Sequence, residues 1–323
     1  MIRVFPLVIA AACLLGGATR ALSQDTYPSH PIKILVGFPA GTSADIIART
    51  YAQKLNEHFK RPVLVENRLG VASNLAAEAV ANAPPDGYTL LLGGVTNTIS
   101  ASLYKNLSFD FKNDLVPLAM AGNATNVLVV SPSLRVSSVQ EFIALARLRQ
   151  GQLLYGSAGL GTAPHLTAEM FNIQTGVAME HIPYKGNNQG LIDLIGGRLS
   201  AIFAPAPTVA GFIKDGRVKA LATTSAKRSA MLPDIPTLAE SGLPGFDTSI
   251  WYGFFAPKGT PDHRVHQLAE LIQRAANSQD VRSQLAANGA DTVIMTHDEF
   301  AKFTKAELLK WEKVVTTLKI KVE

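Results

Sequence analysis

The stretch PIKILVGFPAGTSADIIART, residues 31–50, decides the fold class because it passes from strand to helix through one short loop. Pro31 to Val36 is an apolar run rich in β-branched residues, which predicts a strand. From Ala44 to Phe59 the apolar residues recur with the helical period, which predicts an amphipathic helix. A strand that leads directly into a helix is the unit from which α/β folds are built.

The same unit repeats further along the chain. Residues 63–66 and 89–92 have strand character, and the helical period of 75–83 stops at Pro84-Pro85-Asp86-Gly87. The order strand–helix–strand–helix–strand predicts a mainly parallel sheet with helices on both faces. In such sheets ligands bind at the carboxyl ends of the strands, in the loops that enter the helices. Those loops are therefore the places to search for function.

The alternation restarts after Leu118, which indicates a second domain. Roughly 300 residues are more than a single core usually organises. We expect later strands at 126–130, 153–156, 220–224 and 251–255, and helices at 138–149, 164–171, 264–287 and 297–318.

Residues 1–23 have the order of a secretory signal peptide. Arg3 precedes an apolar run from Val4 to Gly17, and small residues then lead to a cut after Ser23, with a cut after Ala21 as the alternative. The run is shorter than the roughly 20 apolar residues that span a bilayer. Cys13 lies within the removed peptide, so the mature chain is expected to have no disulfide, thiol catalysis or cysteine metal site.

The distribution of basic residues along the sequence argues against a nucleic-acid partner. The 30 Lys and Arg residues exceed the 25 Asp and Glu residues by five, and removal of Arg3 and Arg20 lowers the formal charge from +5 to +3. Basic residues form no cluster with interleaved aromatic residues, as nucleic-acid binding requires. The small positive charge mildly favours anionic solutes.

Two strand-to-helix loops carry the chemistry that the sequence offers. In the first, Gly37 to Asp45, the first N–H groups of the helix point outward, and Thr42 or Ser43 can cap it. In the second, Gly156 to His165, three glycines and two hydroxyls repeat this chemistry. Such helix starts bind anions, so one from each half could grip a carboxylate. The alternative is that both are only well-capped turns, with His165 packed internally.

Enzyme motifs are incomplete. Tyr155-Gly156-Ser157-Ala158-Gly159 lacks the first glycine of a nucleophile elbow, although Ser157, His165 and Asp193 can be written as a triad. No phosphate-binding loop is present, and the seven histidines lack metal-ligand spacing. We therefore expect no catalytic residue, metal or cofactor, and keep a secreted serine hydrolase using Ser157 and His165 as the alternative function.

From Tyr27 to Trp311 the chain resembles the Bug family, the TctC-like extracytoplasmic solute receptors of tripartite tricarboxylate transporters. The resemblance rests on motifs that are weak singly and strong together. They are Tyr27-Pro28 with 38–45, 65–68 with Gly70, 85–90, 156–166, 183–186, Gly196-Gly197, Arg228 with 232–240, and 251–253 with 256–261.

The resemblance implies a type II periplasmic binding protein fold. Two lobes, 24–126 plus 251–323 and 127–250, would each hold a mainly parallel sheet flanked by helices and would close on a ligand by hinges near Asn126 and Ile250. The family pinches one carboxylate between the two loops in the cleft. The residues implied in binding are Phe38, Ala40, Gly41, Thr42, Ser43, Asp45, Thr96, Asn97, Ser157, Gly159, Thr162, His165, Tyr184, Lys185 and Asp193.

Several of these residues have a structural alternative. Asp45 is expected to hold its loop rather than contact solute, and Asn67-Arg68 either fixes a helix start or touches the ligand. Arg68 and Lys185 are the candidates for a second carboxylate. Thr42 departs from the family, which commonly has a second glycine at this position. Unlike glycine, threonine resists positive φ and adds a hydroxyl group to the loop.

The partners implied are a small carboxylate solute and a membrane transporter or sensor. A monomer in the periplasm is expected, because a clamp must open and close freely. Dicarboxylates, tricarboxylates, acidic amino acids and aromatic carboxylates all remain open as ligands.

Overall fold

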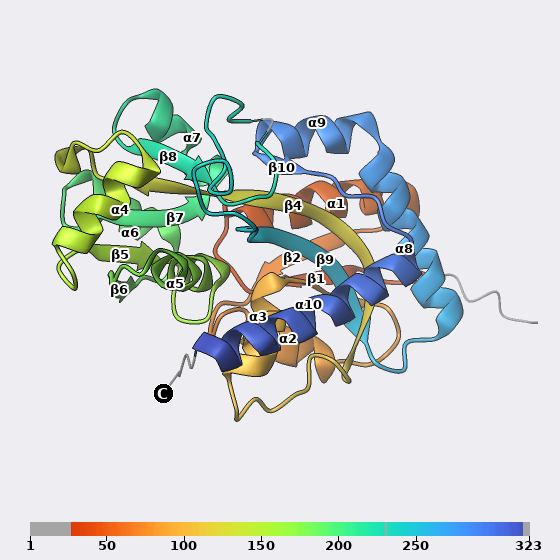
Figure 1. Ribbon diagram of the computed structural model, residues 1–323. Coiled ribbons are helices and arrows are strands. Elements are labelled where there is room, and N and C mark those ends of the chain that lie inside the picture. Colours follow the sequence, from red (N-terminus) through yellow and green to blue (C-terminus); the bar gives the residue numbers. More distant parts are fainter. Residues whose placement is uncertain (1–26, 230, 319–323) are drawn as a thin grey trace, which may run out of the picture.

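The computed structural model describes residues 27–229 and 231–318, which form two α/β lobes side by side (Figure 1). One hydrogen-bonded path runs through the sheets of both lobes in the order β2-β1-β3-β9-β4-β7-β5-β6, and β8 and β10 also pair with β4. The expected α/β fold of two lobes is confirmed. Within the described chain no helix is both long and apolar enough to span a membrane.

Lobe 1 is built around three parallel strands. β1 (Ile32–Val36) lies between β2 (Val63–Asn67) and β3 (Thr89–Gly94), and pairs with both in parallel register. β9 (Ser249–Pro257) adds to β3 in the antiparallel sense. The helices of this lobe are α1 (Ser43–Phe59), α2 (Asn74–Ala81), α3 (Val95–Leu103), α8 (Asp262–Asn277), α9 (Gln279–Ala287) and α10 (His297–Leu318), and β10 is Ala290–Asp291.

Lobe 2 repeats this plan. β5 (Leu154–Ser157) lies between β6 (Glu180–Pro183) and β7 (Ala201–Pro205), again in parallel register. β7 and β8 (Lys219–Thr223) both pair antiparallel with β4. The remaining elements are η1 (Pro132–Leu134), α4 (Val139–Leu148), α5 (Ala163–Thr175), α6 (Asn187–Ile195) and α7 (Ala206–Lys214).

The long strand β4 (Leu115–Val130) joins the lobes, and β9 crosses beside it (Figure 1). β4 pairs with β9 up to Thr125, and from Asn126 onward it pairs with β7. Alternate residues of its second half enter different cores: Leu128 and Val130 pack on one face of the sheet, and Val127 and Val129 on the other. This alternation follows from the two-residue period of a strand.

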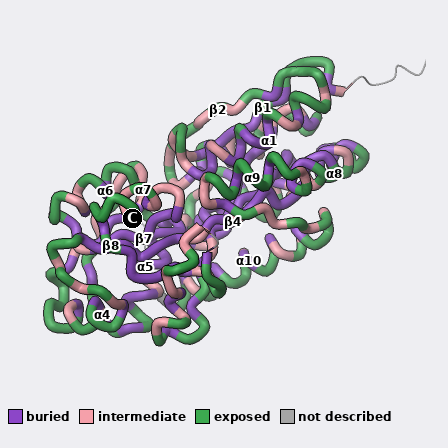
Figure 2. Tube along the Cα trace, turned by 90° about the horizontal axis from the view of Figure 1, so that it is seen from above, coloured by how far each residue is buried: buried purple, intermediate pink, exposed green. Residues whose placement is uncertain are grey.

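The buried residues lie inside each of the two lobes (Figure 2). The core of lobe 1 uses residues between 32 and 124 and between 250 and 315, together with Ala163 and Leu166 from α5. Both cores of lobe 2 use residues between 127 and 246.

The sequence analysis placed most elements correctly and was wrong at a few. The helix expected over 264–287 is two helices, since the extended backbone of Ser278 separates α8 from α9. The strand expected at 126–130 is the last third of β4. Seven elements of the described chain were not predicted: α3, η1, β6, α6, β7, α7 and β10.

Candidate functional site

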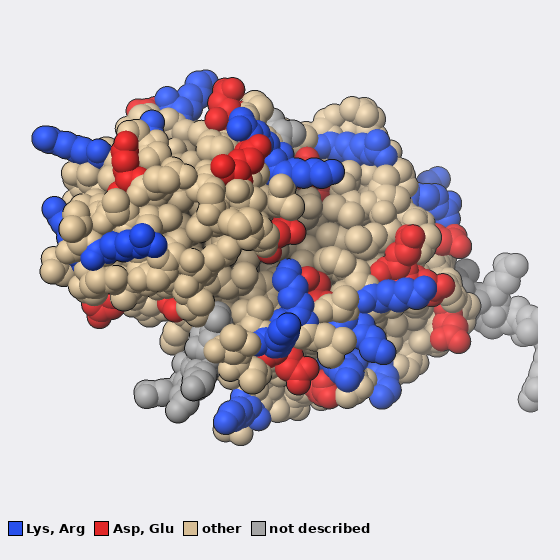
Figure 3. Space-filling model, in the orientation of Figure 1, with Lys and Arg blue, Asp and Glu red and all other residues tan. Residues whose placement is uncertain are grey.

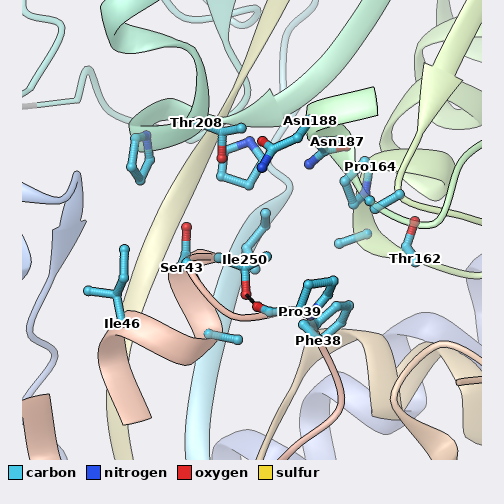
Figure 4. Close-up of a pocket in the computed structure, with 18 of the residues that line it drawn as sticks. Phe38, Pro39, Ser43, Ile46, Thr162, Pro164, Asn187, Asn188, Thr208 and Ile250 are labelled. Carbon is cyan, nitrogen blue, oxygen red and sulfur yellow. Dashed lines mark hydrogen bonds between the residues drawn. The ribbon is translucent and has the colours of Figure 1, made fainter. Parts of the chain in front are cut away.

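A cavity of about 370 Å³ lies between the lobes, at the carboxyl ends of the parallel strands (Figure 4). From lobe 1 the cavity is lined by the first loop and the start of α1, at Phe38, Pro39, 41–44 and Ile46, and by Thr96 and Tyr252. Lobe 2 contributes the starts of α5, α6 and α7. This is the position at which open α/β sheets bind ligands.

The first loop turns into α1 through Gly41, whose φ is 77°, and Thr42, which is the N-cap with φ −79°. The Thr42 hydroxyl donates to the Pro39 carbonyl at 2.7 Å, and the Gly41 amide donates to the Asp45 carboxylate at 2.9 Å. The expected difficulty at Thr42 does not arise, since its backbone is extended and the positive φ falls on Gly41.

The second loop has the same geometry, position by position. Gly161 has φ 74° and the N-cap Thr162 has φ −78°. The Thr162 hydroxyl donates to the Gly159 carbonyl at 2.7 Å, and the Gly161 amide donates to His165 Nδ1 at 3.2 Å. Thr42 therefore corresponds to Thr162, and Asp45 to His165.

Donors remain free at the start of α1. The first N–H groups of a helix have no intrahelical acceptor, and the amides of Ser43 and Ala44 make no hydrogen bond within the described part of the chain. The Ser43 hydroxyl is buried without a partner in the described residues, and it projects into the cavity (Figure 4). A buried hydroxyl without a hydrogen bond is costly, so this end of the cavity is suited to an acceptor.

A charged network anchors the first loop. The Asp45 carboxylate accepts hydrogen bonds from the Gly41 amide, from Arg49 Nε at 2.9 Å and from Asn67 Nδ2 at 2.9 Å. Burial alone would raise the pKa of Asp45, but the hydrogen bonds from Arg49, Gly41 and Asn67 hold this pKa below its usual value. Asn67 also donates to the Phe38 carbonyl at 2.9 Å, so it holds the loop.

Stacked neutral rings anchor the second loop. The ring of His181 stacks on two neighbours. Its centroid lies 4.2 Å from that of His165 and 4.9 Å from that of Tyr155. Burial lowers the pKa of His165 to about 3, with a further contribution from His181, and burial lowers the pKa of His181 to about 4. Both imidazoles are therefore neutral at neutral pH.

The proposed triad is wrong. The Ser157 hydroxyl hydrogen-bonds His181 Nε2 at 2.7 Å and not His165. Asp193 accepts hydrogen bonds from the Tyr184 hydroxyl at 2.7 Å and from Arg198, outside the cavity. Ser157 also accepts the Gly159 amide at 3.1 Å, so it braces the loop.

Of the residues implied in binding, the structure brings fewer than half to the cavity wall. Those that line it are Phe38, Gly41, Thr42, Ser43, Thr96, Thr162 and Lys185. Those that do not are Ala40, Asp45, Asn97, Ser157, Gly159, His165, Tyr184 and Asp193, and Arg68 is also outside it. Asn97 is absent from the wall because its Oδ1 accepts the Gly94 amide at 3.1 Å and caps α3.

The far wall of the cavity was largely missed. Asn187, Asn188 and Gln189 begin α6, and Pro207 and Thr208 begin α7. The helix after β7 follows the same strand-to-helix pattern as the other two loops, and this pattern is the signal that could have found it. Ile250 and Asn288 come from later segments and carry no local signal.

Comparisons with known proteins show which family the chain belongs to. The model of the tripartite tricarboxylate transporter family receptor, TctC, matches residues 47–320. Protein BugT of Bordetella pertussis is 37% identical over 310 residues, which are 95% of this chain and 95% of BugT.

Two solved structures are similar over the whole fold. R. palustris Rpa4515 with adipate has a TM-score of 0.86 and 33% identity, covering 91% of this chain and 99% of that one. MatC from Rhodopseudomonas palustris with bound malate has a TM-score of 0.83 and 28% identity, covering 90% and 100%. The resemblance found in the sequence is thereby confirmed. This chain belongs to the tripartite tricarboxylate transporter receptor family.

Proposed function

We propose that this protein is a periplasmic receptor that holds one carboxylate group of a small solute between the starts of α1 and α5. The observation that carries the proposal is the pair of matched loops, one from each lobe, that face a single cavity with free backbone donors and the unpartnered Ser43 hydroxyl. The positive end of each helix dipole adds to the attraction for an anion. The ligands of two relatives, adipate and malate, are carboxylates.

The residues proposed to contact the carboxylate are those at the two helix starts that line the cavity. They are Thr42, Ser43, Ala44, Thr162 and Ala163, with Phe38 and Thr96 beside them. Asp45, Ser157, Gly159 and His165 are proposed to position these donors from behind. The protein itself carries out no chemical step in this proposal.

Closure of the cavity is proposed to use the crossing strands. The change of partner in β4 between Thr125 and Asn126 supports a hinge there, with a second at Ile250 of β9. It also supports the lobe boundaries 24–126 plus 251–323 and 127–250. Hinge closure around a ligand is a common motion of periplasmic binding proteins.

The location and partners follow from the family. Its receptors are periplasmic, and the signal peptide expected over 1–23 lies outside the described residues. We propose that a monomer delivers its solute to a membrane transporter or sensor.

Calorimetric titration of small carboxylates, with their amides as controls, tests the proposed function. Binding of an acid and not of its amide is expected, because only the ionised group accepts charge-assisted hydrogen bonds from the helix starts. Ser43→Ala removes one donor and is expected to weaken binding about tenfold. Ser283→Ala, on the exposed face of α9, is the control and leaves the affinity unchanged. Equal binding of acids and amides would contradict the proposal.

A further inference from the structure

A second hollow lies in lobe 2, away from the solute cavity. It is a groove of about 500 Å³ between the segment 132–137, the end of α7 and the start of β8. Val130 at the end of β4 pairs with Lys219 at the start of β8 and with Ala201 at the start of β7. Since β7 ends at Pro205, on the cavity wall, the groove lies at the opposite end of these strands from the cavity.

β8 is an edge strand of the sheet in lobe 2. It pairs with β4 on one side, and on its other side Thr223 bridges to Thr237. Within the described chain the backbone of residues 219–222 makes no hydrogen bond beyond its ladder with β4. A row of unpaired N–H and C=O groups on an edge strand can bind a strand of another chain.

The groove lies beside this free edge, and its wall offers apolar surface on both faces of the sheet. Val136 packs on the core of one face, and Ile213 and Ile235 pack on the core of the other. All three side chains are partly exposed, and all three line the groove. An added strand could therefore bury apolar side chains here as well as pair its backbone.

The wall of the groove is positively charged. Arg135 and Lys219 are its charged residues, both are exposed, and neither forms an ion pair within the described chain. Glu141 lies next to the wall, where its carboxylate already accepts hydrogen bonds from the Ser137 amide at 2.7 Å and the Ser137 hydroxyl at 2.9 Å. Among the exposed residues that adjoin the wall in sequence the charges cancel: Lys214, Asp215, Arg217 and Asp234.

We propose that β8 and this groove dock an extended, acidic segment of a partner protein, which adds to β8 as a further strand. The backbone of the segment pairs with residues 219–222, its apolar side chains fill the groove, and its carboxylates reach Arg135 and Lys219. A second copy of this chain fits less well. Pairing of β8 with β8 would place Arg135 and Lys219 of both copies along one short ladder, and like charges there repel.

Docking at this groove is independent of the solute. Every residue of its wall lies between 132 and 235, within lobe 2, so closure of the lobes does not change it. A partner could therefore hold the protein both before and after the solute is released. The inference does not depend on which group the solute cavity binds.

Fluorescence anisotropy with a labelled, capped hexapeptide of alternating glutamate and valine tests the docking site. The peptide is expected to bind, and raising NaCl from about 0.1 M to about 1 M should weaken binding, since the screening length falls from about 10 Å to about 3 Å. Two control peptides are expected to bind at least tenfold more weakly. One has N-methylated backbone amides and cannot pair with an edge strand, and the other has lysine in place of glutamate.

A double variant tests the two cations. Arg135→Gln with Lys219→Gln should weaken binding of the acidic peptide about tenfold, because both ion pairs are lost. Arg149→Gln with Lys227→Gln makes the same change of charge at exposed positions of lobe 2 outside the groove, and should leave the affinity unchanged.

Hydrogen exchange locates the bound peptide. Protection is expected at the amides of residues 219–222 and not at those of 41–48, at the start of α1. Protection at 41–48 alone would show that the acid groups of the peptide enter the solute cavity, and would overturn the inference. Absence of binding, or equal effects of the two double variants, would also overturn it. A dimer in sedimentation that dissociates in Arg135→Gln with Lys219→Gln would assign the groove to a second copy instead. The proposed function stands in each of these cases.

Discussion

The two loops at the cavity, 37–45 in lobe 1 and 156–165 in lobe 2, share one backbone geometry and differ in what holds it. In each, a glycine with positive φ precedes a threonine N-cap, and the glycine amide donates to the side chain four residues later. In lobe 1 that acceptor is the charged Asp45, and in lobe 2 it is the neutral ring of His165.

The difference shows that a helix start can be positioned by charge or by stacking. Asp45 accepts hydrogen bonds from Arg49 and Asn67, and these help to hold its pKa below the usual value. His165 needs no counter-charge, and it gains packing on His181 instead. Only the first anchor depends on a carboxylate, and only the second contributes stability that is lost as the pH falls below about 6.5.

The largest effect is expected when the stacked anchor is removed. His165→Ala deletes a buried ring and the acceptor of the Gly161 amide, and leaves a cavity beside His181. The free energy of unfolding should fall by about 3 kcal/mol, measured by urea denaturation followed by circular dichroism. His58→Ala, in the last turn of α1, is the control. A loss as small as that of the control would show that the ring does not anchor the loop.

A smaller loss is expected for the charged anchor. Asp45→Ala leaves the Gly41 amide without its acceptor, but Arg49 is half exposed and recovers water. The free energy of unfolding should fall by about 2 kcal/mol, and carboxylate affinity should fall with it because Ser43 moves. Asp215→Asn, at the end of α7, serves for comparison. Unchanged carboxylate affinity in Asp45→Ala would show that the hydrogen bonds of Asp45 do not contribute to ligand binding.

The smallest effect is expected from pH, as the loss of stability for each histidine ring and each pH unit. The folded-state pKa values of His165 and His181 are lowered to about 3 and about 4. Unfolded histidine titrates near a pKa of about 6.5, so the unfolded state takes up protons first as the pH falls. The stability these rings contribute is present above pH 6.5 and is lost progressively below it, by at most about 1.4 kcal/mol for each ring and each pH unit.

Asp45 does not contribute to this loss until the pH is much lower. Its pKa is lowered in the folded state, so its contribution is present above the unfolded value of about 4 and disappears as the pH falls through the folded value. Denaturation midpoints between pH 7 and 5 check the difference. The His165→Ala variant should lose less stability over this range than the wild-type protein, and equal slopes would contradict the assignment.

The surface agrees with the charge argument made from composition. Lys, Arg, Asp and Glu are interspersed on the face drawn in Figure 3, without a large area of one sign. This distribution fits a protein whose selectivity lies in its cavity and not in a basic surface.

The sequence alone determined the fold class and the two loops. Strand and helix periods are local, so β1, α1, β5 and α5 could be recognised from the order of apolar residues and from the glycines before each helix. The anion-binding character of both loops followed from the orphan N–H groups of any helix start. The order of the family motifs supplied the receptor class.

Only the tertiary structure decided which residues reach the cavity. Ser157 turned toward His181, and Asp193 toward Tyr184 and Arg198, because each found a hydrogen-bond partner in space that the chain order does not reveal. The far wall is assembled from α6 and α7, whose starts meet α1 only because β4 and β9 cross between the lobes. Local period depends on neighbours in sequence, whereas the charge and lining of a cavity depend on contacts between segments far apart along the chain.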